Sequence, residues 1–188
     1  MLRQALSHVR SSIAPALAGL ALAAAPLAAQ VTAGRAVTLD QGAVAGAALS
    51  TLTDGAFQPD QTQWTSGSVY WNGTTTRLLI DLGGIFDLTG IIAQTDHNDT
   101  YRIEFRNPTT SLFSSFFAFS PSDAFGLRTY PNPANNAEIG SLGGTFRADQ
   151  IRFSAVSGDN SYSVTEIQLY GTAASVNTTV PESRPPWR

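Results

Sequence analysis

The densest group of chemically active side chains in the sequence is Asp96-His97-Asn98-Asp99. Two carboxylates, an imidazole and an amide on consecutive residues could bind a polar ligand or transfer protons. The group falls between two expected strands, which places it at the tip of a loop. The alternative is a solvated turn in which Asp and Asn bond their own backbone.

Any catalytic imidazole would have to be that of His97, because it is the only histidine after residue 29. The sequence has no Gly-x-Ser-x-Gly elbow for a nucleophilic serine and no pair of histidines for a zinc site. Paired carboxylates could serve a glycosidase, and the candidate pairs are Asp96 with Asp99 and Glu104 with Glu166. Nothing separates these pairs from ordinary surface acids, so we predict that the protein is not an enzyme.

Glu166 is the one carboxylate within the last expected strand, which runs from Ser163 and ends at Gly171. Alternation along this strand predicts that Thr165, Ile167 and Leu169 share one face. The other face would carry Glu166 together with Val164, Gln168 and Tyr170. A carboxylate buried among apolar side chains needs a partner, which the rest of the chain must supply.

The elements that would position these groups are short strands. Residues 101–106 alternate apolar and charged side chains, which is typical of a half-buried strand. Further apolar runs cover residues 68–72, 77–82, 91–93, 112–119, 125–130 and 146–155, and Gly or Pro turns separate them. No amphipathic helix is apparent after residue 29. The sequence therefore predicts an all-β protein, an antiparallel sandwich or barrel.

Composition excludes several classes of function. The chain of 188 residues has no Cys, which excludes disulfides and thiolate metal sites. All eleven basic residues are Arg, so lysine chemistry is excluded as well. The net charge is −3 and no basic cluster is present, so nucleic acid is not expected as a partner.

Residues 1–29 have the pattern of a secretory signal peptide, with arginines, then an apolar run, then small residues. A membrane anchor is the alternative, but the apolar run is short for a span. We therefore expect a secreted or extracytoplasmic protein, with cell-surface association as an alternative, whose mature chain has no stable membrane span. Residues 30–171 would form the β-sandwich. Residues 172–188 carry three prolines and few apolar groups, and we expect a disordered tail.

The order of several segments resembles the discoidin, or coagulation-factor C-type, domain of the galactose-binding-like jelly rolls. These segments are Leu52-Thr53-Asp54-Gly55 before Trp64, Ile80-Asp81-Leu82-Gly83, Gly90-Ile91, Ile151-Arg152-Phe153 and Glu166-Ile167-Gln168-Leu169-Tyr170-Gly171. The resemblance covers residues 31–171 and implies an antiparallel jelly-roll β-sandwich, discoidin-like and galactose-binding-like.

A narrower resemblance is to a bacterial group of such domains in exported proteins with a Val-Pro-Glu-Pro (PEP-CTERM-like) sorting tail. The residues that carry it are Gln94–Asp99, Phe125–Thr129, Ser157–Asn160 and Val180-Pro181-Glu182. Ser183 stands where the group has its second proline, and neither the membrane helix nor the basic end follows. A frameshift or truncation would explain this degenerate tail.

The discoidin resemblance implies a structural Ca²⁺ between an early Asp-Gly loop and a late glutamate. Its ligands would be Asp54, Asp60, Thr62 and Glu166, with backbone carbonyls completing the shell. Calcium is a hard cation that takes six to eight oxygens in irregular loops, which suits these residues. The alternative is that Asp54 caps its own turn and Glu166 faces water.

In sugar-binding relatives the loop equivalent to Asp96, His97, Asn98 and Asp99 lines the ligand site. Tyr70 or Trp71 could add an aromatic platform, and Arg128 a further polar group. The resemblance thus implies a non-catalytic exported module that recognises an extracellular glycan or matrix polymer, or another surface ligand, through loops at one end of the sandwich. The alternative is a structural or matrix-associated surface protein, with a role in adhesion and no small ligand.

Overall fold

A computed structural model describes residues 28–119 and 125–175 of the chain. Most of the predicted signal peptide and tail therefore lies outside the described residues. Ten strands and one short 3₁₀ helix make up these ranges, and every strand pairing is antiparallel, so the all-β prediction is confirmed. Among the described residues, no helix has the length and apolar character to cross a membrane.

The elements are β1 (Ala29–Gln30), β2 (Val37–Gln41), β3 (Ala45–Gly46), η1 (Leu49–Thr53), β4 (Val69–Asn72), β5 (Arg77–Asp96), β6 (Thr100–Arg106), β7 (Phe113–Phe119), β8 (Leu127–Tyr130), β9 (Gly140–Ser157) and β10 (Ser161–Ala173).

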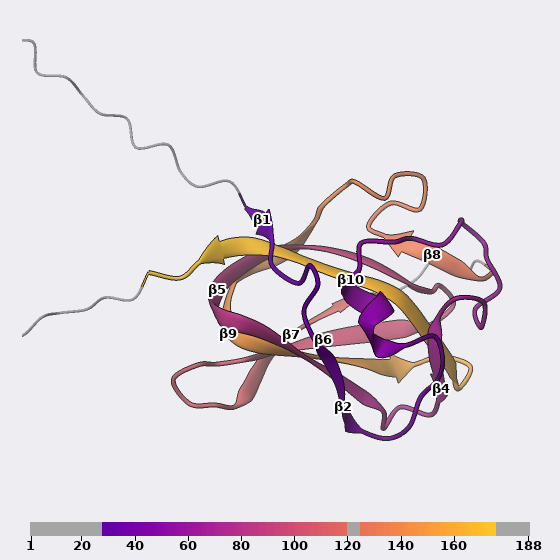
Figure 1. Cartoon of the computed structure of the whole chain (residues 1–188), viewed down its shortest axis with the longest axis horizontal. Coiled ribbons are helices and arrows are strands. Elements are labelled where there is room, and N and C mark those ends of the chain that lie inside the picture. Colours follow the sequence, from indigo (N-terminus) through magenta and orange to yellow (C-terminus); the bar gives the residue numbers. More distant parts are fainter. Residues whose placement is uncertain (1–27, 120–124, 176–188) are drawn as a thin grey trace, which may run out of the picture.

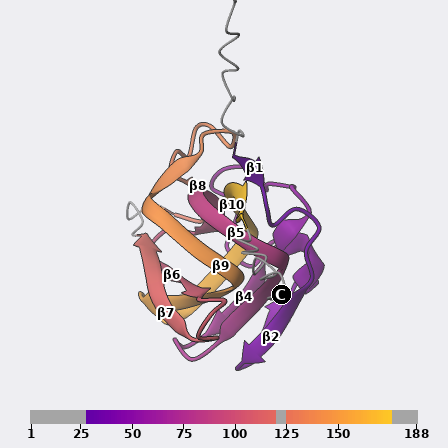
Figure 2. The ribbon, with the colours of Figure 1, turned by 90° about the vertical axis from the view of Figure 1, so that its left-hand side faces the viewer.

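The main path through the sheet runs β3-β4-β10-β5-β9-β6-β7, with β1 on β10 and with β2 and β8 on β5. The start of β5 pairs with β2 and β9, whereas its end pairs with β10 and β8. Because β5 and β9 are long and bend, they join two layers that enclose one interior (Figures 1 and 2). The sequence suggested separate strands at 77–82 and 91–93, but bulges allow one strand to continue through Gly83 and Gly84.

Aromatic rings fill the centre of the interior. The ring centroid of Phe153 lies 5.4 Å from that of Tyr101 and 6.4 Å from those of Trp71 and Phe119. The alternation predicted along β6 is confirmed, because Tyr101, Ile103 and Phe105 are buried while the residues between them are partly exposed.

The predicted faces of β10 are wrong at Val164, which lies on the core face with Ile167 and Leu169. Val164 pairs with Thr95 and Glu166 with Gln94, so Thr165 is an extra residue that forms a β-bulge. The bulge resets the alternation, and Val164 and Ile167 both belong to the hydrophobic core. Glu166 remains on the opposite face.

That opposite face of β10 is covered by the N-terminal part of the domain. The Val31 amide donates to the Leu169 carbonyl oxygen (2.7 Å), and the Thr32 hydroxyl donates to the Ile167 carbonyl oxygen (2.9 Å). Figure 1 shows this segment and the short helix η1 lying over β10. As a result, every residue of β10 from Tyr162 to Leu169 is buried.

The ends of the domain differ slightly from the predicted boundaries. β10 continues to Ala173, two residues past the predicted end, because Thr172 and Ala173 pair with the Asp87–Phe86 part of β5. Ala29, expected to close the signal peptide, pairs with Gly171.

Replacing Phe153 with alanine should lower the free energy of unfolding by about 3–5 kcal/mol, since it leaves a cavity among packed rings. Urea denaturation followed by circular dichroism would measure the change. Phe116, an exposed phenylalanine on β7, is the matched control, and its replacement should cost about 0.5 kcal/mol or less. Equal effects at both positions would contradict this description of the core.

Candidate functional site

Four segments meet at the end of the sandwich away from β1: residues 60–62, 96–99, 125–128 and 157–160. We call this set the loop rim. The Asn98 side-chain amide donates to Asp159 Oδ2 (3.1 Å), which joins the second segment to the fourth. The His97 backbone amide donates to the Gly126 carbonyl oxygen (3.3 Å), and Leu127 exchanges backbone bonds with Gln61 and Thr62. The predicted loop cluster is therefore part of a larger surface.

Asp99 is buried within the loop rim and organises it. Its Oδ1 accepts from the Asp159 backbone amide (3.3 Å), and its Oδ2 accepts from the Tyr101 hydroxyl (3.2 Å). The Tyr101 oxygen in turn accepts from the Ser163 amide (3.2 Å). Gly158 is required here, because a Cβ would collide with Asp99 Oδ1. Asp99 thus links three elements and is not available as an exposed ligand contact.

The two buried carboxyl groups of the rim titrate near neutrality. Burial raises the pKa of Asp96 to about 6, and the negative charge of Asp159 raises it further. Burial also raises the pKa of Asp99 to about 7, with an added contribution from Asp96, although the Asp159 amide bond opposes the shift.

His97 and Arg128 lie close together at the rim. Burial lowers the pKa of His97, and the Arg128 charge lowers it further, so the imidazole is neutral at pH 7. Arg128 Nη1 lies 3.0 Å from Asp60 Oδ2. A neutral ring and a planar ion pair offer both hydrogen-bond donors and acceptors to a polar ligand.

Phe125 is the exposed aromatic residue at this rim, with 67% of its surface accessible. It precedes Gly126, whose carbonyl bonds to His97. The sequence reasoning missed Phe125, although an apolar ring beside a turn glycine was a possible signal. An exposed aromatic ring on this segment could stack on the apolar face of a sugar.

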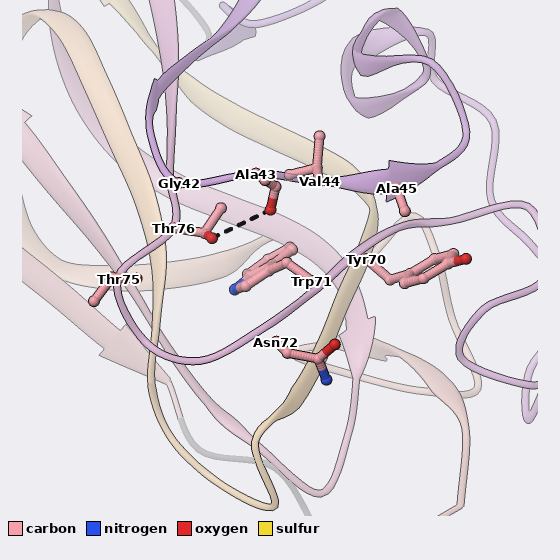
Figure 3. Close-up of a pocket in the computed structure, with 9 residues that line it drawn as sticks. All are labelled: Gly42, Ala43, Val44, Ala45, Tyr70, Trp71, Asn72, Thr75 and Thr76. Carbon is pink, nitrogen blue, oxygen red and sulfur yellow. Dashed lines mark hydrogen bonds between the residues drawn. The ribbon is translucent and has the colours of Figure 1, made fainter.

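The predicted platform residues Tyr70 and Trp71 do not join the loop rim. Trp71 is only 3% exposed and packs in the core, with its ring centroid 6.1 Å from that of Tyr162. Tyr70 meets Trp64 edge to face at 5.4 Å. Both line a separate pocket, whose lining includes neither His97 nor Arg128 (Figure 3). The structure therefore brings Asp96, His97, Asn98, Asp99 and Arg128 together but separates Tyr70 and Trp71 from them.

The predicted calcium ligands are also divided into two groups. The Gly55 amide donates to Glu166 Oε2 (3.2 Å), and Asp54 is near enough for its charge to act on Glu166. Asp60 instead pairs with Arg128, and the Thr62 hydroxyl donates to the Pro59 carbonyl oxygen (2.7 Å). No group of three or more His, Cys, Asp or Glu residues within 28–119 and 125–175 is arranged to hold a metal ion.

Glu166 itself has an unusual environment. It is fully buried, so the alternative in which it faces water is wrong, and its Oε1 has no hydrogen-bond partner among the described residues. Burial raises its pKa to about 7, and the charge of Asp54 contributes to the rise. An unsatisfied buried carboxylate oxygen fits either a bound cation or a proton. Asp54 Oδ1 accepts from the Ala56 amide (2.8 Å), as the alternative for this residue anticipated.

Comparisons with known proteins identify the fold. No protein-family model matches the chain, and no curated protein matches it. A fucolectin from striped bass (Morone saxatilis) serum superposes with a TM-score of 0.58 at 12% identity, covering 80% of this chain and 51% of that one. The lectin-binding domain of lectinolysin, a His 62 mutant complexed with Lewis b, superposes with a TM-score of 0.54 at 11% identity, covering 79% of this chain and all (100%) of that one.

This chain shares the fold of these lectin domains. The predicted class, an antiparallel jelly-roll β-sandwich of the discoidin-like kind, is confirmed. At such low identity the likeness concerns fold alone.

Raising the pH from 5 to 8 should lower the free energy of unfolding, by on the order of 3 kcal/mol. The folded-state pKa values of Asp96, Asp99 and Glu166 lie above the ordinary values of 3.8 for Asp and 4.5 for Glu, so the folded state binds more protons in this range. The lowered pKa of His97 offsets part of this effect. Urea denaturation at several pH values measures the slope. The Asp99→Asn variant should show a smaller change in the free energy of unfolding between pH 5 and 8.

Asp87→Asn is the control for that experiment, because a hydrogen bond from Arg147 lowers the pKa of Asp87. This variant should keep the wild-type slope between pH 5 and 8. A slope that Asp99→Asn leaves unchanged would show that Asp99 does not titrate in this range.

Proposed function

We propose that the protein is a non-catalytic, exported binding module that recognises a glycan or another extracellular surface ligand through the loop rim. The observation that carries the proposal is an exposed phenylalanine, Phe125, on the segment that bonds the His97 backbone, together with the Arg128–Asp60 ion pair. The fold shared with two lectin domains supports it.

The chemistry of the rim suits a sugar. Pyranose rings have an apolar face that packs on an aromatic ring, and hydroxyl groups that need both donors and acceptors. Phe125 offers the ring, Arg128 offers donors and Asp60 offers acceptors. The Gly126 carbonyl already holds the His97 backbone amide, so this part of the loop does not have to be ordered at binding, which limits the entropy cost.

The carboxylates that could have served hydrolysis have structural roles. Arg152 binds Glu104 through two hydrogen bonds (2.8 and 3.0 Å) on the outer face of the sheet. Glu166 lies beneath the loop that contains Gly55. Asp99 bonds Tyr101 and Asp159. These engagements favour recognition over catalysis.

A glycan array of neutral and acidic sugars tests the proposal. We expect binding to at least one class of glycan, and Phe125→Ala should weaken it by about tenfold or more because the stacking ring is lost. His97→Ala and Arg128→Ala should weaken it to a similar extent. Phe116→Ala is the matched control, since Phe116 is equally exposed but lies on β7, away from the rim.

If the folded protein binds no glycan on the array, the result would favour the alternative class, a structural or matrix-associated surface protein without a small ligand. Binding that Phe125→Ala and Phe116→Ala weaken equally would place the ligand elsewhere.

We also propose a structural Ca²⁺ held by Glu166 and Asp54, with backbone carbonyls of the Asp54–Gln58 loop as further donors. The unsatisfied Glu166 Oε1 supports this, because a hard cation would satisfy the oxygen and remove the cost of burying the charge. The division of the predicted ligands argues against Asp60 and Thr62, which are engaged at the loop rim. The ion would fix the early polar loop to β10.

Calcium should raise the melting temperature at pH 8 by about 5 °C relative to chelator, and less at pH 6, where Glu166 is partly protonated. Differential scanning calorimetry measures the shift. Glu166→Gln should abolish the response to calcium, and magnesium is the control ion. Superimposable curves with calcium and chelator at pH 8 would reject the site.

A further inference from the structure

A second concave site lies beside the loop rim, between residues 42–45 and the turn that joins β4 to β5 (Figure 3). This pocket has a volume of about 370 Å³, which falls in the range of small-ligand sites. Apolar and uncharged polar side chains line it: Gly42, Ala43, Val44, Ala45, Tyr70, Trp71, Asn72, Thr75 and Thr76.

Trp71 gives this pocket its distinguishing feature. Its ring is 3% exposed and packs against Tyr101, Phe153 and Tyr162 on the core side. Its indole Nε1 is buried and has no hydrogen-bond partner among the described residues. Buried indole N–H groups usually donate a hydrogen bond, and a buried N–H group without an acceptor lowers the stability of the fold. In Figure 3 this nitrogen lies on the Thr75–Thr76 side of the ring, between the two loops.

Polar side chains near the indole donate to backbone carbonyl oxygens. The Thr76 hydroxyl donates to the Ala43 carbonyl oxygen (3.4 Å) across the pocket wall. The Asn72 amide nitrogen donates to the Asn160 carbonyl oxygen (3.0 Å), toward the β9–β10 turn. An acceptor for the indole N–H would therefore come from a molecule that enters between the loops.

We propose that this pocket binds one uncharged sugar ring, with an oxygen of the sugar accepting from Trp71 Nε1. The choice of a sugar rests on the proposed function. The location of the site rests on the pocket and on Trp71 Nε1, which has no hydrogen-bond partner among the described residues. No Asp, Glu, Arg or His is among the nine lining residues, so a charged ligand would lose hydration without compensation. The alanines and Tyr70 suit the apolar face of the ring. A hydroxyl or an acetamide carbonyl supplies the missing acceptor.

Nuclear magnetic resonance of ¹⁵N-labelled tryptophan side chains tests the proposal on the whole protein. The chain has three tryptophans, and Trp71→Phe identifies the Trp71 indole signal by its loss. Titration with galactose and with N-acetylglucosamine, up to about 50 mM, should shift that signal saturably for at least one of them. Glucuronate should bind at least fivefold more weakly than the better neutral sugar.

Two variants assign the effect to the pocket. Trp71→Phe keeps an aromatic ring but removes the donor, and calorimetry should show binding about tenfold weaker. Thr75 is exposed at the pocket mouth, so Thr75→Phe should leave the melting temperature unchanged while it abolishes the shift of the Trp71 signal. The second variant keeps the test valid if Trp71→Phe unfolds the protein.

The outcomes separate this site from the loop rim. Phe125→Ala and Arg128→Ala should leave the Trp71 shift intact, even where they abolish array binding. A Trp71 signal that no sugar moves in the folded protein would overturn the proposal and indicate a pocket that holds only water. A shift that Thr75→Phe leaves unchanged would also overturn it. A silent array with a saturable Trp71 shift would reject the rim and support the pocket.

Discussion

The structure depends on the burial of both faces of β10. One face packs in the core, while the N-terminal segment and the early polar loop cover the other. Polar groups trapped beneath this cover must find partners. The buried Gln94 side chain meets this requirement: its Nε2 donates to the Gln58 carbonyl oxygen (2.9 Å), and its Oε1 accepts from the Gln58 amide (2.8 Å) and the Thr165 hydroxyl (2.7 Å). These bonds fix the polar loop to β5 and β10.

The position of the loop rim follows from that attachment. Once Gln58 is held, the chain continues to Asp60 and places Gln61 and Thr62 along the free side of β8. Asp60 then reaches Arg128 on that strand. Asp99, through Tyr101 and Asp159, holds the adjoining loop and the β9–β10 turn in register. The rim is thus preorganised by buried polar bonds, and its outer groups are free to meet a ligand.

The β9–β10 turn belongs to the loop rim and also contacts the Trp71 pocket. Asp159 accepts from Asn98 on the rim side, and Asn160 accepts from Asn72 on the pocket side. One short turn therefore contacts both candidate sites. Two weak sugar contacts on the same end of a module could engage one extended glycan, where a second contact acts at high effective concentration. Jelly-roll folds serve many functions, so these side chains, not the fold, carry the functional argument.

Local patterns in the sequence determined much of this protein. The alternation from Tyr101 to Arg106 predicted β6, and short apolar runs between glycine turns predicted an antiparallel all-β fold, because strand periodicity is a local property. The same reasoning found the polar cluster from Asp96 to Asp99, since its members are neighbours in the chain. The position of Arg128 beside it came from a resemblance and agrees with the structure.

The tertiary structure decided the features that depend on contacts between distant segments. The bulge at Thr165 put Val164 on the core face of β10, and no local signal marks it because the pairing with β5 creates it. Asp60 and Glu166 were grouped as ligands of one ion, but the attachment of Gln58 to Gln94 carries Asp60 away toward Arg128. Trp71 and Phe125 are both aromatic residues near turns, yet one is buried in the core and the other is exposed. Burial depends on which other segments cover a side chain, and that is settled only when the whole chain has packed.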